Sequence, residues 1–301
     1  MKYFIVDAFT DQAFGGNPAG VVLLDSDAFP EEVLMLNIAA ELRYSETAFV
    51  RRHSDHEFTI RYFTPAAEVE LCGHATIASF SLLHQKGLAS GTCLCHTKAG
   101  DLLIEAGEKV MMQMAKPHIA ATIVDTGEIY QALGVKDYRP TMPVQVVSTG
   151  LPDLMIPLPD VVTLQSLQPD MEAISEITKE HDAVSFHVFA FGNDSYTAHV
   201  RDFAPLYDIP EESATGTANA SLTYYFQQHG SIGAEAECAF IQGEAMGRPS
   251  VVATRIQSDG NIFVGGTATV VAEGILKGIT AATIQLIADK QIHVFRAANL
   301  G

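Results

Sequence analysis

The chain has 301 residues, of which 48% are hydrophobic and 18% charged, enough for one large domain or two ordinary ones. Its formal net charge of -18 and the lack of a lysine and arginine cluster argue against the basic patch that a phosphate backbone requires, so we expect no nucleic-acid partner. No run approaches the roughly 18 apolar residues that span a bilayer, and the 4 cysteines are too few for a disulfide scaffold. We therefore expect a cytoplasmic protein without membrane contact.

The first part of the chain predicts short strands around two helices. Apolar residues at helical spacing predict a helix from about Pro30 to Glu41. A second helix is predicted within residues 71–87. Small residues occupy its N-terminus, apolar residues its interior, and Gly87 is suited to cap its C-terminus. Short β-rich segments bounded by turn residues predict the strands KYFIVDAF, GVVLLD, EFTIRYF, LLIEA and KVMMQM.

The second part repeats this pattern after a join that we expect between Lys116 and Thr122. Residues 214–230, ATGTANASLTYYFQQHG, align without a gap with residues 71–87, LCGHATIASFSLLHQKG. Both helices are apolar on nearly every side, which indicates burial. The strands predicted around the second helix are VQVVST, LMIPL, VSFHVFAF, YTAHVR, SVVATRI and IFVGGTATVVAEG.

These elements predict an α+β fold of two pseudo-symmetric halves, residues 1–118 and 119–301. Each half is expected to wrap a mostly β structure around its own central helix, and the two halves meet at a cleft. The tail after about residue 276 extends past the repeated elements, and packing of this tail on the first half is left open.

The paired helix starts predict an anion site in the cleft. A start such as Gly-His-Ala-Thr or Gly-Thr-Ala-Asn offers free backbone N–H groups and the positive end of the helix dipole. Two such starts aimed into one cleft suit a carboxylate without any lysine or arginine. One such start is more often an ordinary core helix, but the matched second copy favours a functional interpretation.

Polar residues beside these starts are candidates for the chemistry. Glu46 lies in YSETAF, just before an apolar strand, where an isolated glutamate is more often a cap or an exposed strand end. His74 follows Gly73 directly, and a satisfied structural histidine is its alternative. Asp208, Glu211 and Glu212 precede the second start, where acids also stabilise a helix dipole.

Other site types are not supported. Cys93, Cys95 and His96 have zinc-like spacing, but no second pair accompanies them. The phosphate-binding, dinucleotide-binding and serine-elbow motifs do not occur. We therefore expect no metal and no cofactor.

Six ordered segments carry a family resemblance: VDAFTDQAFGGNPAGVV, YSETAFV, RYFTPAAEVELCGHAT, VRDFAPLYDIPEESATGTA, IQGEAMGRPS and VGGTATVVAEG. The chain resembles the phenazine-biosynthesis PhzF-like isomerases, which are related to diaminopimelate epimerase and the proline racemases. The resemblance implies a diaminopimelate epimerase-like fold, with a β-barrel-like sheet around each central helix, and a possible homodimer. It also implies that Glu46 takes a proton from one carbon of a small carboxylate substrate and returns it to another. The implied site contains His74 and Glu212 as further catalytic residues and Asn17, Gly73, Gly216 and Thr217 as substrate-binding residues.

Two departures limit what the resemblance implies. Family members usually read Glu-Asp-Pro-Ala-Thr-Gly-Ser where residues 211–217 read Glu-Glu-Ser-Ala-Thr-Gly-Thr, so a relative's substrate does not transfer. The related racemases use two facing cysteines, which correspond here to Cys72 and Thr215. Threonine is not acidic near neutral pH, so proton transfer by Glu46 alone is favoured. The alternatives are an epimerase or racemase that uses Cys72 with a carboxylate partner, and a metabolite-binding protein without catalytic activity.

Overall fold

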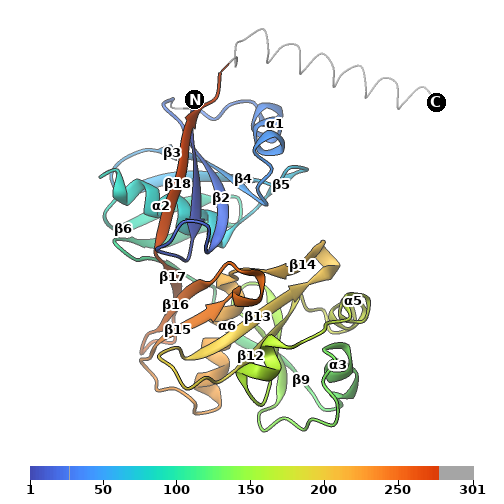
Figure 1. The fold of residues 1–301 in the computed structure, drawn as a ribbon. Coiled ribbons are helices and arrows are strands. Elements are labelled where there is room, and N and C mark those ends of the chain that lie inside the picture. The colour runs from blue at the N-terminus through green and yellow to red at the C-terminus, as the bar shows by residue number, and fades with distance from the viewer. Residues whose placement is uncertain (27, 278–301) are drawn as a thin grey trace, which may run out of the picture.

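Two lobes make up the protein, each a curved sheet around one buried helix (Figure 1). The computed structural model describes residues 1–26 and 28–277. The central helix of the first lobe is α2 (Gly73–Gln85), and that of the second is α6 (Gly216–Gln228). The sequence predicted both helices.

The two sheets have the same strand order and the same directions. In the first lobe the hydrogen-bonded order is β18–β1–β2–β3–β4–β6–β7–β8, with β2–β3 and β4–β6 parallel and the other pairs antiparallel. In the second lobe it is β9–β10–β11–β12–β13–β15–β16–β17, with β11–β12 and β13–β15 parallel. The short strands β5 and β14 pair with β4 and β13. The pseudo-symmetry predicted from the repeated helix therefore extends to the sheets.

The strands have the following bounds. Those of the first lobe are β1 (Lys2–Ala8), β2 (Asn17–Leu23), β3 (Thr47–Arg52), β4 (Glu57–Phe63), β5 (Glu68–Val69), β6 (Gly91–Thr97), β7 (Gly100–Ala106), β8 (Val110–Gln113) and β18 (Ala268–Ile275). Those of the second are β9 (His118–Ile123), β10 (Val144–Ser148), β11 (Pro152–Pro157), β12 (Ser185–Ala190), β13 (Ala198–Ala204), β14 (Ile209–Glu212), β15 (Glu237–Gln242), β16 (Ser250–Ile256) and β17 (Ile262–Gly266).

The last strand, β18, returns from the second lobe and pairs with β1, in the position that β9 holds beside β10 (Figure 1). The lobes are also joined where β8 pairs with β17. The predicted division at residues 118 and 119 coincides with the start of β9 and stays a prediction. Leu276 donates its amide hydrogen to the carbonyl of Met1 at 2.9 Å, whereas the tail from residue 278 lies outside the described residues.

The central helices are buried because their sequences are apolar on all sides. Ten of the residues of α2, His74 to Leu83, are buried, and their sheet supplies an enclosing layer of aliphatic and aromatic side chains. Both helices end where the sequence predicted, since Gly87 and Gly230 take left-handed φ values of 68° and 69° just past them.

The remaining helices lie outside the barrels. The helix α1 (Glu32–Leu42) connects the parallel strands β2 and β3, close to the predicted bounds. The other helices of the described residues belong to the second lobe and are α3 (Gly127–Ala132), α4 (Val161–Gln165), α5 (Met171–Glu180) and the 3-10 turns η1 (Pro205–Tyr207) and η2 (Glu244–Met246). Among the described residues, no helix is both long and apolar enough to cross a lipid bilayer.

Candidate active site

Four of the predicted site residues meet in one cluster. Glu46 immediately precedes β3, and its Oε2 lies 3.3 Å from Nε2 of His74. The other ring nitrogen, Nδ1, lies 4.0 Å from Oε1 of Glu212. Asn17 begins β2 and donates a hydrogen bond from Nδ2 to the same Oε1 at 3.0 Å. The imidazole of His74 therefore lies between a carboxyl group from each lobe.

Sheet pairing and helix entry bring these residues together. The amide of Gly20 on β2 donates to the carbonyl of Glu46 at 3.0 Å, which ties the glutamate to the neighbouring parallel strand. His74 is the second residue of α2. Glu212 ends β14, shortly before the start of α6. Each side chain thus lies at an element end, where strands and helix starts face the other lobe.

The glycines that open the two helices are not required by packing. Neither has a positive φ. A Cβ atom on Gly73 would meet Met112 Cε at 3.7 Å, and one on Gly216 would meet Val264 at 3.6 Å and Phe9 at 3.7 Å, which are ordinary contact distances. The residues before them, Cys72 and Thr215, form no side-chain cap with their helices. Glycine at both starts therefore leaves space beside the helix N-termini, where an anion could approach the backbone.

The side chain of Glu46 has an oxygen that is available to a ligand. Its Oε2 is buried and has no hydrogen-bond partner of normal geometry among the described residues, although the Cys72 thiol lies close enough to interact with the carboxyl group. The nearby Nε2 of His74 lies within ion-pair distance, but the contact does not have hydrogen-bonding geometry. Instead, the Oγ atom of Ser45 lies 3.4 Å from that nitrogen. A buried and unpaired carboxyl oxygen costs folding free energy, which makes this atom a candidate for chemistry.

The other two titratable groups of the cluster are held neutral. Burial lowers the pKa of His74, and the charge of Glu46 offsets only part of this effect. Burial, followed by the charge of nearby Asp202, raises the pKa of Glu212 to about 8. Near neutral pH the cluster therefore contains a neutral imidazole and a protonated Glu212.

Cys72, at the first helix start, is also protonated. Its Sγ lies 3.5 Å from Nδ1 of His74, and burial, followed by the charge of Glu46, raises the pKa of the thiol well above its usual value. A neutral thiol is a poor base and nucleophile. The ligand-type atoms of Glu46, Cys72 and His74 lie within 4.8 Å of one another, and a metal ion at this group would itself favour the thiolate form of Cys72.

The remaining predicted residues have other surroundings. Thr217 is the second residue of α6, and its carbonyl accepts a hydrogen bond from Thr149 at 3.0 Å. Glu211 pairs with Arg201 through two hydrogen bonds of 2.8 Å, which is a structural role. Asp208 ends η1 in a left-handed turn with φ 61°.

Sequence reasoning missed polar residues behind Glu212. Gln242 donates from Nε2 to the Glu212 carbonyl at 2.9 Å and to Thr215 Oγ1 at 3.1 Å. Asp202 accepts a hydrogen bond from Thr215 Oγ1 at 3.0 Å. Both are polar residues inside buried strands, Asp202 within VRDFAP and Gln242 within IQGEAM. That placement was the available signal.

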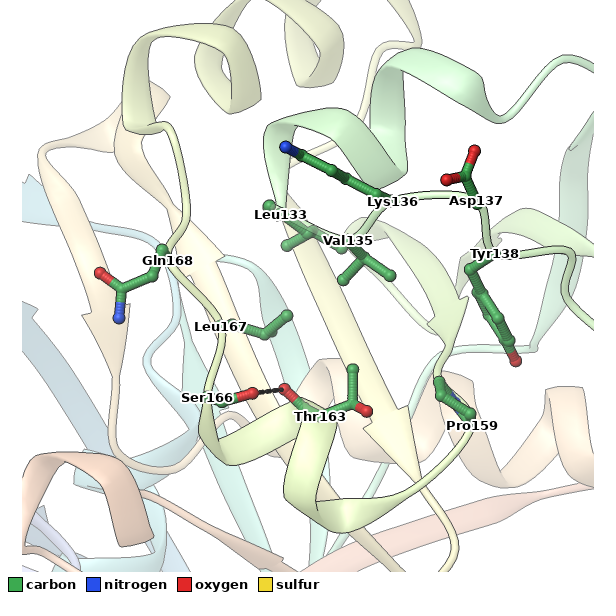
Figure 2. A pocket seen from close by; sticks show the side chains of 11 residues that line it. Leu133, Val135, Lys136, Asp137, Tyr138, Pro159, Thr163, Ser166, Leu167 and Gln168 are labelled. Carbon is green, nitrogen blue, oxygen red and sulfur yellow. Dashed lines mark hydrogen bonds between the residues drawn. The ribbon is translucent and has the colours of Figure 1, made fainter.

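A separate hollow of about 390 Å³ lies on the second lobe, beside the loop after α3 and the loops around α4 (Figure 2). Lys136, Tyr138, Thr163 and Gln168 are among its lining residues. None of the residues of the cluster between the lobes lines it. The hollow is therefore separate from the candidate active site at the cluster.

Comparison with known proteins agrees with this geometry. Residues 6–274 match the family model described as phenazine biosynthesis-like protein. The chain belongs to the PhzF-like family. An uncharacterized isomerase of Deinococcus radiodurans is 36% identical to it over 296 residues, covering 92% of the chain and 95% of that relative. The predicted family is therefore confirmed, and the chain is a PhzF-like isomerase.

Solved structures confirm the predicted fold. A Bacillus anthracis phenazine biosynthesis protein of the PhzF family superposes with a TM-score of 0.82 at 28% identity, covering 92% of the chain and 99% of that structure. A probable proline racemase from Agrobacterium radiobacter shares the fold, with a TM-score of 0.60 at 11% identity over 92% and 93% of the two chains. The PhzF-like chain thus has the diaminopimelate epimerase-like α+β fold.

Proposed function

We propose that the protein is a cofactor-independent isomerase that moves a proton between two carbons of a small carboxylate-bearing metabolite. Glu46 is the acid and base of this reaction. The observation that carries the proposal is the buried Oε2 of Glu46, which lacks a hydrogen-bond partner among the described residues and lies beside His74 between the lobes. A general base must have such a free oxygen within reach of the proton that it removes.

The surrounding groups suit an anionic substrate. Its carboxylate would lie at the open N-termini of α2 and α6, beside Gly73 and Gly216, where the helix dipoles stabilise negative charge. Because His74 and Glu212 are neutral near pH 7, Glu212 adds no negative charge to repel this anion. Asn17 orients the Glu212 carboxyl through its hydrogen bond.

In the reaction, a Glu46 oxygen takes the proton from an activated C–H bond, and the electron pair of that bond stays on the substrate. The resulting carbanion is delocalised over the neighbouring unsaturated groups. Glu46 then returns the same proton to a second carbon of this system, on the same face. The substrate is isomerised, and Glu46 ends in its starting protonation state.

An epimerase or racemase that uses Cys72 is less well supported. The Cys72 thiol is held protonated by burial, and the corresponding position at the second helix start is Thr215, whose hydroxyl group already bonds carboxyl groups. A metabolite-binding protein without activity could also use the free oxygen of Glu46 as a ligand contact, so turnover has to separate this alternative from the isomerase.

The test is a panel of small carboxylates with activated C–H bonds, incubated in deuterated water and followed by NMR. We expect the wild-type protein to isomerise one class, Glu46→Gln to lose turnover while still binding it, and Cys72→Ser to remain active. Full activity of Glu46→Gln would refute the proposal. Loss of activity in Cys72→Ser alone would favour the racemase, and binding without turnover would favour the non-catalytic protein.

We also infer that the protein acts in the cytoplasm, without nucleic-acid or membrane partners, because its negative charge disfavours phosphate backbones and its four cysteines are free thiols. A homodimer stays a prediction, which sedimentation analysis would test.

A further inference from the structure

Behind Glu212, a row of buried polar side chains extends into the second lobe. The strand register creates it, because Asp202 on β13 lies opposite both Glu212 on β14 and His187 on β12. Asp153 on β11 lies opposite Ser185 on β12 in the same way. Asp153, Ser185, His187 and Asp202 are each at most 1% exposed. From this arrangement we infer that Asp202 is a positioning residue that acts through Thr215 to keep Glu212 protonated. The inference deepens the proposed function, because a neutral Glu212 is what lets an anion enter the cleft.

The first step is the hydrogen-bond capacity of Thr215. Its Oγ1 lies 3.0 Å from Asp202 Oδ2 and 2.9 Å from Glu212 Oε2, and it accepts a hydrogen bond from Gln242 Nε2 at 3.1 Å. A hydroxyl group has one hydrogen and two lone pairs. It can donate to only one of the two carboxyl groups, so the other carboxyl must be protonated and donate to the remaining lone pair.

The second step identifies the ionised partner as Asp202. Its Oδ1 accepts hydrogen bonds from Ser185 Oγ at 2.7 Å and from Nδ1 of His187 at 2.9 Å. With Thr215, three groups that can donate contact this carboxyl group, whereas among the described residues two, Asn17 and Thr215, form hydrogen bonds with the Glu212 carboxyl. The hydrogen of Thr215 therefore goes to Asp202, and the proton of the pair stays on Glu212.

The hydroxyl group of Ser185 also lies between two carboxyl groups and has one hydrogen to donate. Its hydroxyl lies 2.7 Å from Asp202 and 3.0 Å from Asp153 Oδ1. Since it donates to Asp202, Asp153 must be protonated and donate to it. The other oxygen of Asp153 is buried without a partner among the described residues, which costs less for a neutral acid than for a carboxylate. Burial, followed by the charge of Asp202, also raises the pKa of Asp153.

The groups that face Glu212 from the neighbouring elements support this assignment. They are Asp202 from β13, Glu46 from the start of β3, His74 from α2 and Asn17 from β2. In the part of the chain that the structure describes, no lysine or arginine forms an ion pair with Glu212, Asp202 or Asp153. The charge on Asp202 therefore acts on Glu212 without a compensating lysine or arginine among these residues, and this repulsion favours the protonated acid.

The test measures the Glu212 carboxyl directly, in protein labelled with 13C at the glutamate side-chain carboxyls, by NMR titration without substrate. The Glu212 signal is the one absent from Glu212→Gln. We expect Asp202→Asn to lower the pH at the midpoint of the Glu212 titration by about one unit or more. One unit is a tenfold change in the acid dissociation constant of Glu212. The matched control is Asp153→Asn, whose amide can donate to Ser185 as the protonated acid does. It should leave the midpoint close to the wild-type value.

An unchanged or raised midpoint in Asp202→Asn would overturn the inference. A shift in Asp153→Asn as large as in Asp202→Asn would also overturn it, because the charge would then lie on Asp153. If Asp202→Asn does not fold, infrared spectroscopy at neutral pH decides. Asp153→Asn should lose a protonated-carboxyl band of the wild type, and retention of every such band would refute the assignment. These readouts need no turnover, so they stand or fall separately from the role of Glu46.

Discussion

Replacing Glu212 with glutamine should stabilise the protein at neutral pH, and the gain should grow with pH. Folding raises the pKa of this carboxyl from 4.5 to about 8. A raised pKa contributes stability that is fully present below the unfolded value and is lost as pH rises through the folded value. Between about pH 4.5 and 8, wild-type folding therefore takes up a proton that Glu212→Gln does not need.

The size of the effect follows from the same shift. Each pH unit above the unfolded pKa costs the wild type about 1.4 kcal/mol until the folded pKa is reached. From 4.5 to pH 7 this amounts to about 3 kcal/mol. Because the side chain is 24% exposed, water screens part of the penalty, and we expect about 2 to 3 kcal/mol at pH 7. Glutamine can keep both contacts, donating to Thr215 as the acid does and accepting from Asn17.

Urea unfolding of both proteins at intervals from pH 5 to 8.5 measures this difference. The free energy of unfolding of Glu212→Gln, relative to wild type, should rise with pH and level off near pH 8. The control is Glu211→Gln, the adjacent substitution, which breaks the pair with Arg201 and should lower the free energy of unfolding. A difference between Glu212→Gln and wild type that stays constant from pH 5 to 8 would refute the reasoning.

Two further predictions concern the helix starts and the loop between β1 and β2. Gly73→Ala and Gly216→Ala should keep the fold, because a Cβ fits at both sites, and should weaken substrate binding by calorimetry; a large fall in melting temperature with unchanged binding would contradict this. Arg248→Met should lower the free energy of unfolding in urea by about 2 to 4 kcal/mol, because Arg248 bonds Asp7, which is 3% exposed, and two carbonyls of the loop between β1 and β2. An unchanged stability would show that this contact is not needed.

Helix bounds and strand starts could be predicted from the sequence, because they depend on residues that are close together in the chain. The central helices were recognised by their apolar bodies and by closing glycines at residues 87 and 230, which adopt the left-handed conformation. The helix predicted from about Pro30 to Glu41 is Glu32–Leu42. Glu46 lies just before a strand, as its local pattern indicated. In each case the deciding interactions join residues close together in the chain.

Strand partners and buried contacts could not be predicted in this way. The pairing of β18 with β1 joins opposite ends of the described chain, and an alternating strand pattern does not specify its partner. The role inferred for Asp202 was missed for the same reason, since its neighbours come from β12, β14 and the start of α6.

The sequence alone determined that two similar buried helices with glycine starts exist and that a glutamate precedes a strand, because backbone propensity and apolar periodicity act over a few residues. Only the tertiary structure decided which groups share a proton. That outcome depends on burial and on charges a few ångströms apart, and strand register together with the packing of the central helices brings such groups together.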